Sequence, residues 1–165
     1  MKLLLFGKNG QVGDALQKAF NGKNIITLSR AECDFMNTQS ITKALNEYSP
    51  NVILNAAAYT AVDMAEDDAV AAKVINTQAV EAMANWAAEN DALLVHYSTD
   101  YVFDGSKGRP YKEKDKTNPL GAYGKSKLDG EVSIMENNCR SIIVRTSWLY
   151  SNLGSNFVKN IINLA

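Results

Sequence analysis

Tyr123 and Lys127, which stand four positions apart, are the residues of this chain best suited to proton chemistry. On a helix, positions i and i+4 share one face, so the phenol and the ammonium lie together. A nearby ammonium favours the phenolate and lowers the pKa of the tyrosine, which makes the phenol a proton donor usable near neutral pH. A glycine-rich turn after an apolar strand opens the same chain. We therefore predict a carbonyl-reducing enzyme that uses a nicotinamide cofactor.

The glycine turn occupies residues 7–13, with Gly7, Gly10 and Gly13 in the spacing G-x-x-G-x-x-G. Glycines allow a tight turn there and let the backbone approach a pyrophosphate at the helix N-terminus, as they do in the spacing G-x-G-x-x-G. A glycine turn alone is weak evidence, but its place between the first predicted strand and helix favours cofactor binding.

Ser29 and Arg30 directly follow the second predicted strand. An acidic residue there would bond the ribose 2′-hydroxyl of NAD and repel a 2′-phosphate, whereas a hydroxyl followed by a cation can hold that phosphate. Glu32 and Asp34 lie close by and oppose this interpretation, and Arg30 as a solvated loop residue is the alternative. We predict NADPH as the cofactor, with NADH as the second choice.

Small residues follow the third predicted strand, in the run N-A-A-A-Y-T at 55–60. Open α/β sheets bind ligands at the carboxyl ends of their strands, where small side chains let a flat nucleotide lie against the backbone. Alanine-rich packing between sheet and helix is the alternative for this run.

Apolar runs of strand length alternate with helical stretches, which is typical of a parallel sheet built from βαβ units. The predicted fold is α/β, a doubly wound, Rossmann-like parallel sheet of five strands in one domain over residues 1–165. The predicted strands are 2–6, 24–28, 51–55, 92–97 and 141–145, and the predicted helices are 11–20, 40–48, 70–89, 121–136 and 156–165.

Composition narrows the function classes. The net charge of −1 gives no reason to expect nucleic acid or an anionic membrane as a partner. The first apolar run ends at Gly7, too short for a signal peptide or a membrane span. Cys33 and Cys139 lack metal-ligand spacing and indicate reduced thiols in a cytoplasmic protein. The single histidine, His96, lies inside a predicted strand and is interpreted as a core residue, so we predict no metal site.

Several motifs in order carry a resemblance over nearly the whole chain: L-F-G at 5–7, G-Q-V-G at 10–13, N-A-A-A-Y-T-A-V-D at 55–63, S-T-D-Y-V-F at 98–103, Y-G-K-S-K at 123–127 and R-T-S-W-L-Y at 145–150. With these motifs the chain resembles the extended short-chain dehydrogenase/reductases and, within them, the dTDP-4-dehydrorhamnose reductase family. The resemblance implies reduction of the 4-keto group of a dTDP-linked sugar, and hence a nucleotide-sugar substrate.

The resemblance also implies roles for single residues. Tyr123 would donate a proton to the 4-keto oxygen, and Lys127 would hold the nicotinamide ribose and lower the pKa of Tyr123. Thr99 would orient the carbonyl, while Asp100 and Trp148 would contact the sugar nucleotide. The predicted cofactor contacts are Gly7, Gly10, Gln11, Val12, Gly13, Ser29, Arg30, Asp34, Phe35, Ala58, Tyr59, Thr60, Tyr97, Tyr123 and Lys127.

The chain departs from the family pattern at two points. Family members often carry a glutamate two residues after the last glycine of the turn, and some use it in a metal-bridged dimer. Here Asp14 and Ala15 follow Gly13, so a metal is not predicted and a homodimer stays an open partner. Family members are also considerably longer. We expect residues 1–165 to be the cofactor domain with the catalytic pair, without the C-terminal substrate-binding part.

Two alternatives stay open. A regulatory subunit of methionine adenosyltransferase resembles the same reductases and binds NADP, but a regulatory protein has no need for Tyr123, Lys127 and Thr99 together. An epimerase or dehydratase acting on another nucleotide sugar shares the fold and the tyrosine–lysine pair. A dehydratase commonly has Asp-Glu directly after the threonine, whereas this chain has Asp100 and Tyr101.

Overall fold

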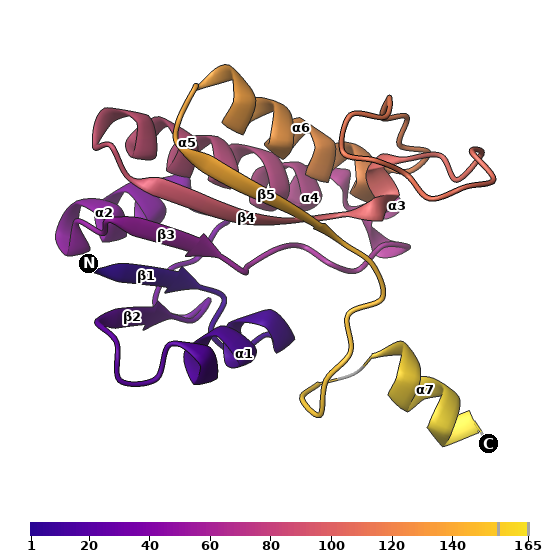
Figure 1. The fold of residues 1–165 in the computed structure, drawn as a ribbon, viewed down its shortest axis with the longest axis horizontal. Helices are drawn as coiled ribbons and strands as arrows, with labels where there is room; N and C mark the ends of the chain where they lie inside the picture. The colour runs from indigo at the N-terminus through magenta and orange to yellow at the C-terminus, as the bar shows by residue number, and fades with distance from the viewer. Residues whose placement is uncertain (155, 165) are drawn as a thin grey trace.

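Five parallel strands form one sheet in the order β2-β1-β3-β4-β5 (Figure 1). The computed structural model describes residues 1–154 and 156–164. The predicted α/β fold with a five-stranded parallel sheet is confirmed, and every predicted strand is present. The strands are β1 (Leu3–Phe6), β2 (Ile25–Leu28), β3 (Val52–Asn55), β4 (Leu93–Thr99) and β5 (Ser141–Thr146).

The helices agree with the prediction except around residues 64–89. The single predicted helix at 70–89 is three elements, because a π-helical turn interrupts it, and a short helix that was not predicted precedes it. Asp68 separates the short helix from the next one by accepting a hydrogen bond from the Ala71 N–H at 3.2 Å. The elements are α3 (Met64–Asp67), α4 (Ala69–Lys73), the π turn (Val74–Gln78) and α5 (Ala79–Glu89).

The remaining helices follow their predicted segments. They are α1 (Gln11–Ala19), α2 (Thr38–Tyr48), α6 (Ala122–Glu136) and α7 (Phe157–Leu164), and a 3₁₀ turn (Asp100–Val102) follows β4. The last residue of the predicted helix 156–165, Ala165, lies outside the described residues. No helix in the described part of the chain has the length and apolar character needed to cross a membrane.

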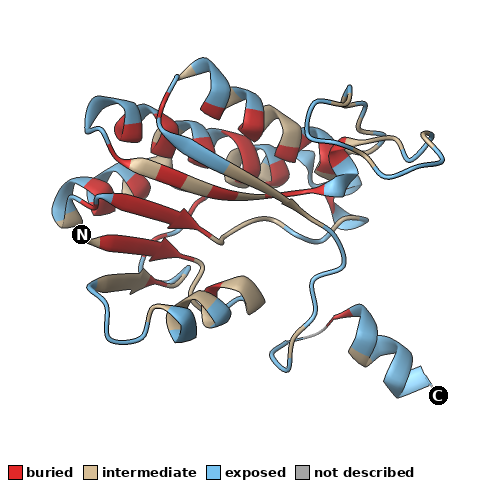
Figure 2. Ribbon diagram, viewed as in Figure 1, coloured by how far each residue is buried: buried red, intermediate tan, exposed pale blue. Residues whose placement is uncertain are grey.

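The sheet is covered on both faces, but unequally. One face packs against α2, α5 and α6 in a large apolar core that includes Phe6, Ile53 and Leu94. The opposite face packs against α1 in a smaller core around Leu5 and Leu54. Figure 2 shows the buried residues concentrated in β1, β3 and β4 and in the helix faces that cover them. Apolar strands buried on both faces explain why continuous apolar runs predicted the sheet correctly.

The strand order places a topological switch point between β1 and β3. The chain leaves β1 toward β2 on one side, while β3 pairs with β1 on the other. Connections on opposite sides leave a crevice at the carboxyl ends of these two strands, where open α/β sheets bind ligands. The glycine turn and the run after Asn55 both begin at this crevice.

Candidate functional site

The glycine turn connects β1 to α1 in very close contact with the end of β3. Gly7 has φ +85°, and a Cβ there would lie 2.7 Å from the Ala56 carbonyl carbon. At Gly13, a Cβ would overlap the Gly7 carbonyl oxygen, so α1 can begin this close to the strand only with glycine. Gly10 is under less constraint, since its nearest contact would be 3.5 Å away. The turn therefore holds the N-terminus of α1 at the crevice, where free N–H groups suit an anion.

A cavity of about 470 Å³ occupies the crevice. Of the predicted cofactor residues, those lining it are Gly7, Gly10, Gln11, Val12, Ser29, Arg30, Asp34, Phe35, Ala58 and Thr60. The cavity is also lined by residues that are not among the predicted cofactor contacts, namely Phe6, Asn9, Leu28, Cys33, Ala56, Ala57, Ile75, Leu149, Leu153 and Gly154. Phe6 and Leu28 end β1 and β2, and Ala56 and Ala57 directly follow β3, so a place at a strand end is the signal that could have found these four.

At the end of β2 the acidic side chain of Glu32 holds Ser29, one of the two residues that were predicted to bind a phosphate. The Glu32 carboxylate accepts hydrogen bonds from the Ser29 N–H at 2.7 Å and the Ser29 hydroxyl at 2.6 Å. It also pairs with Lys8 at 2.7 Å. Lys8 and Ser29 lower the pKa of Glu32 to about 2, so the carboxylate is ionised at neutral pH. Arg30 is largely exposed, 3.7 Å from Asp34.

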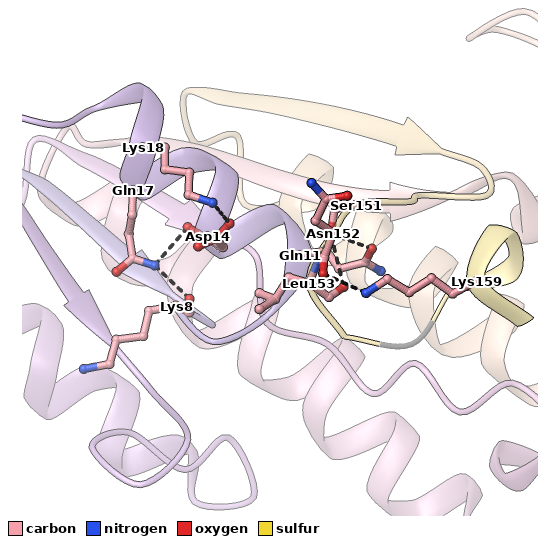
Figure 3. Close-up of polar contacts among 10 residues, drawn as sticks. Lys8, Gln11, Asp14, Gln17, Lys18, Ser151, Asn152, Leu153 and Lys159 are labelled. Atoms are coloured by element: carbon pink, nitrogen blue, oxygen red, sulfur yellow. Dashed lines mark hydrogen bonds and ion pairs between the residues drawn. The ribbon is translucent and has the colours of Figure 1, made fainter. Parts of the chain in front are cut away.

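The segment after β5 contributes to the lining of the cavity. It is tied to α1 by hydrogen bonds to Gln11 (Figure 3). The Gln11 side-chain oxygen accepts hydrogen bonds from the Ser151 hydroxyl at 2.9 Å and from the Asn156 amide at 3.2 Å. Lys159 donates to the carbonyls of Asn152 at 2.7 Å and Gly154 at 2.9 Å. Leu149, Leu153 and Gly154 therefore become part of the cavity wall, although they are far from the glycine turn in sequence.

Asp14, which follows the glycine turn, pairs with Lys18 one helical turn further on at 2.6 Å (Figure 3). Within residues 1–154 and 156–164, no group of three or more His, Cys, Asp or Glu side chains could hold a metal ion.

Helix α6 carries the tyrosine–lysine pair and approaches its neighbours closely through two glycines. A Cβ on Gly124 would overlap the Tyr101 carbonyl oxygen, and a Cβ on Gly130 would overlap the Asn76 carbonyl oxygen. Glu66 caps the N-terminus of the helix by accepting from the Ala122 N–H at 2.7 Å. These contacts set the position of α6 against the end of β4 and against the π turn.

Asn76, in the π turn, ties the loop after β3 to α6. Its side-chain oxygen accepts from the Tyr59 N–H at 2.9 Å, and its amide donates to the Tyr59 carbonyl at 3.1 Å and the Ser126 hydroxyl at 3.0 Å. Single π turns within α-helices are often found at functional sites. Tyr59 is therefore held by its backbone and does not line the cavity, in contrast to its predicted neighbours Ala58 and Thr60.

Tyr123 lies beside Thr99, as the predicted catalytic roles require. A hydrogen bond from Thr99 lowers the pKa of Tyr123, but burial raises it more, and Asp100 adds to the increase, so the net shift is upward. The Tyr101 ring packs edge-on against the Tyr123 ring at 5.7 Å. The prediction that Lys127 lowers the pKa of Tyr123 is wrong for this structure, because the lysine amine is bonded elsewhere.

The amine of Lys127 is buried and turned toward β4. Its Nζ donates to the Tyr97 carbonyl at 2.7 Å and lies 3.2 Å from His96 Nε2. Only 1% of the lysine is exposed, and burial lowers its pKa to about 8. His96 is a buried core residue, as predicted, but its contact with Lys127 was not foreseen. Tyr97 meets Lys127 through its backbone, and Tyr97, Tyr123, Lys127 and Gly13 do not line the cavity.

The two predicted substrate contacts beyond Thr99 lie at the carboxyl ends of β4 and β5. Asp100 accepts from the Ser147 hydroxyl at 2.6 Å. Trp148 is 66% exposed, has φ +51°, and packs edge-on against Phe157 at 4.7 Å. A bulky residue in the left-handed region is uncommon and is concentrated at ligand sites.

Topology and site together define the class of this protein. A Rossmann-like sheet with a glycine turn at its switch point, and a Tyr-x-x-x-Lys helix beside a strand-end threonine, is the architecture of the short-chain dehydrogenase/reductases. All of residues 1–165 match the family model described as RmlD substrate binding domain. The chain belongs to the dTDP-4-dehydrorhamnose reductase family.

Individual relatives agree with this assignment. The chain is 46% identical over 170 residues to a dTDP-4-dehydrorhamnose reductase of Salmonella typhimurium, covering 100% of this chain and 57% of the relative. A dTDP-4-dehydrorhamnose reductase crystal structure from Clostridium acetobutylicum superposes with a TM-score of 0.94 at 44% identity, covering 99% of this chain and 59% of the other. The enzyme of Bacillus anthracis in complex with NADP superposes with a TM-score of 0.93 at 38% identity, over 99% of this chain and 60% of the other. The chain thus spans a little under two thirds of the length of these relatives.

Proposed function

We propose that this chain carries the cofactor site and the proton-donating tyrosine of an NADPH-dependent reductase that converts dTDP-4-dehydro-L-rhamnose to dTDP-L-rhamnose. The observation that carries the proposal is a continuous set of hydrogen bonds between the cavity and the tyrosine–lysine helix. It runs from the Ala57 N–H in the cavity wall through Asn55 and His96 to Lys127. This connection, together with the names of the relatives, supports one site built from both halves.

The residues around the cavity fit a dinucleotide. The glycine turn leaves room for a pyrophosphate against the backbone, and the α1 N-terminus offers Gln11 and Val12 N–H groups. Phe35 and Asp34 line the cavity beyond the end of β2, and we assign the adenine of the cofactor to this side. When bound, the reduced nicotinamide would supply the hydride. Lys127 would hold the nicotinamide ribose.

Proton donation is assigned to Tyr123. Because burial raises the pKa of its phenol, Tyr123 is protonated at neutral pH and can give its proton to the 4-keto oxygen. Thr99, hydrogen-bonded to that phenol, is placed to orient the same carbonyl. Asp100 and Trp148, at the ends of neighbouring strands, are proposed to contact the sugar nucleotide.

The test is a chimera in which residues 1–165 replace the matching part of the Salmonella typhimurium relative. We expect the chimera to oxidise NADPH when supplied with dTDP-4-dehydro-L-rhamnose. Tyr123→Phe in the chimera should lower kcat by about 10²–10⁴-fold, because the phenol acts on the transition state, and should leave the NADPH affinity nearly unchanged. A Tyr123→Phe chimera with more than half the parental turnover would refute the catalytic assignment.

The same chimera separates the reductase from the regulatory alternative. NADPH binding without turnover, in a chimera whose parent enzyme is active, would favour a non-catalytic NADP-binding module. Turnover with UDP-glucose as substrate but not with the dTDP-sugar would instead favour another nucleotide-sugar enzyme of this fold.

A further inference from the structure

His96, the single histidine of the chain, lies between Asn55 and Lys127 with its imidazole completely buried. Its Nδ1 is 3.0 Å from the Asn55 amide nitrogen, and its Nε2 is 3.2 Å from Lys127 Nζ. A neutral imidazole has one donor and one acceptor nitrogen, so the two contacts cannot be of the same kind. The direction of each hydrogen bond therefore determines where protons reside in this row of side chains.

The backbone N–H of Ala57 fixes that direction. It can only donate, and it points at a side-chain atom of Asn55 at 3.2 Å, which must therefore be the amide oxygen. The Asn55 amide nitrogen then faces His96 and donates to Nδ1. With Nδ1 as the acceptor, the proton of a neutral His96 resides on Nε2 and points at Lys127.

Lys127 must then supply a lone pair, which only its neutral amine has. An ammonium at Nζ would place a second donor against the Nε2–H donor. Moving that proton to Nδ1 would instead place it against the donating NH₂ group of Asn55. Exchanging the oxygen and nitrogen of the Asn55 amide would place its NH₂ donor against the Ala57 N–H, which is also a donor. An imidazolium would face donors at both ends, and burial lowers the pKa of His96 well below its ordinary value of 6.5. The neutral amine still donates to the Tyr97 carbonyl at 2.7 Å.

We propose that Asn55 and His96 control the protonation state of Lys127, holding it as a neutral amine until a lower pH, or a bound cofactor that favours the ammonium, makes it take up a proton from the solvent. Burial lowers the pKa of Lys127 to about 8, in keeping with this arrangement. Other ionisable groups act on the amine as well. Glu131, one turn further along α6, raises the pKa of Lys127, but that carboxylate is itself paired with Arg145 of β5 at 2.5 Å.

Tyr123, one turn earlier on α6, is kept neutral by its raised pKa and adds no charge near neutral pH. His96 thereby becomes a positioning residue that acts through Lys127. Its consequence for cofactor binding rests on the proposed function, because Lys127 is assigned there to the nicotinamide ribose. If the bound form of Lys127 is the ammonium, cofactor binding takes up a proton.

The single histidine makes the test direct. The 165-residue chain is labelled with ¹⁵N-histidine, and the two ring nitrogens are followed by long-range ¹H–¹⁵N spectra from pH 6 to pH 10 without cofactor. We expect the Nε2–H tautomer at pH 9, and a change in both nitrogen signals with a midpoint near pH 8, where Lys127 takes up its proton. Lys127→Met should abolish that midpoint, whereas Lys125→Met, at an exposed position of the same helix, should leave it unchanged.

Asn55→Asp should reverse the tautomer of His96. An ionised aspartate only accepts, so it should draw the proton to Nδ1, turn Nε2 into an acceptor and favour the Lys127 ammonium. The expected tautomer is Nδ1–H, with the midpoint moved above pH 8. Asn51→Asp, the same change at the exposed start of β3, is the control and should keep the wild-type spectrum. An Nδ1–H tautomer in the wild-type chain at pH 9, or ordinary protonation of His96 near pH 6.5, would overturn the proposal.

A separate titration with NADPH tests the consequence. Affinity should fall as the pH rises above 8, by at most about tenfold per pH unit, and Asn55→Asp should reduce this dependence. Absence of NADPH binding alongside the expected spectra would refute the proposed function and leave the assignment of His96 standing. Tight NADPH binding alongside an Nδ1–H tautomer would refute the assignment of His96 and leave the proposed function standing.

Discussion

We propose that one carboxylate at the end of β2, Glu32, determines the charge that a cofactor ribose would meet. Glu32 occupies the hydrogen-bonding groups of Ser29 and the ammonium of Lys8, which could otherwise receive a 2′-phosphate. Arg30 is 79% exposed and makes only a long contact with Asp34. On the proposed function, the preference between NADPH and NADH would therefore depend on whether a phosphate can displace Glu32 from its partners.

Neutralising this carboxylate should favour NADPH. We expect Glu32→Gln to tighten NADPH binding relative to NADH by on the order of tenfold, about 1.4 kcal/mol, because the amide neither repels the phosphate nor pairs with Lys8. Arg30→Asp should shift the preference in the opposite direction. Fluorescence titrations with both cofactors measure this, and Glu89→Gln, at an exposed position at the end of α5, is the control. Equal effects on the two cofactors would show that Glu32 does not face the 2′-position.

A second carboxylate, Glu131, is only 1% exposed and depends on Arg145 for its charge compensation. The guanidinium donates to it at 3.0 Å and 3.2 Å from Nε and at 2.5 Å from Nη2, and Ser98 donates to it as well. Removing one partner of a buried pair leaves an uncompensated charge.

Arg145→Met should therefore lower the free energy of unfolding by about 3–5 kcal/mol, measured by urea denaturation. Arg140→Met removes an exposed arginine whose 3.5 Å pair with Asp91 lies at the surface. This control should change stability by less than about 1 kcal/mol. Similar losses in the two variants would mean that the buried pair contributes no more than a surface pair.

The sequence predicted which site residues lie close together, but it did not predict which hydrogen bonds they make. The i, i+4 spacing placed Tyr123 and Lys127 on one helix face, and the strand-end threonine fell beside the tyrosine. The spacing carries no information about rotamers, however, and the buried amine of Lys127 found its hydrogen-bond partners on β4, the Tyr97 carbonyl and His96. His96 was recognised as a core residue, but its role depends on a neighbouring strand and on a helix distant in sequence.

Among the elements, α6 owes its position to two glycines, which let it approach neighbouring backbone closely. Gly130 lies against the carbonyl of Asn76 in the π turn, and Thr77 donates to the Ser126 carbonyl at 2.9 Å. The π turn was not predicted, because the periodicity of residues 70–89 is that of one continuous helix. The strands, in contrast, were predicted within one or two residues, since each is a short, largely apolar run, and the central strands β1 and β3 are buried throughout.

Gly130→Ala should push α6 away from the π turn. We expect a loss of about 1–3 kcal/mol in unfolding free energy, since the new methyl group would overlap backbone that cannot move alone. NADPH affinity should fall as well, because Lys127 lies on the displaced helix. Ser133→Ala, further along α6, is the control and should stay within about 0.5 kcal/mol of the parent. A more stable Gly130→Ala protein would show that helix propensity outweighs the close contact.

At the scale of the whole molecule, apolar surface is distributed unevenly. Helices α2, α5 and α6 cover one face of the sheet, whereas the smaller core on the other face is formed around α1. Strand β5 is an edge of the sheet, and part of it is exposed (Figure 2). Its Ile142 is 50% exposed. None of the residues described in α7 is buried. The helix nevertheless carries apolar side chains, and Ile161 and Ile162 are 51% and 67% exposed.

Exposed apolar side chains beside an open strand edge promote association between copies. We therefore expect the 165-residue chain to self-associate with rising concentration, as measured by light scattering. Ile142→Lys and Ile162→Lys should each reduce the association, because a charge on an edge strand or on an apolar helix face opposes pairing. Met135→Lys, at an exposed position of α6, is the control and should leave the association unchanged. A monodisperse monomer at every concentration, with parent and variants alike, would show that this surface does not bind a second copy.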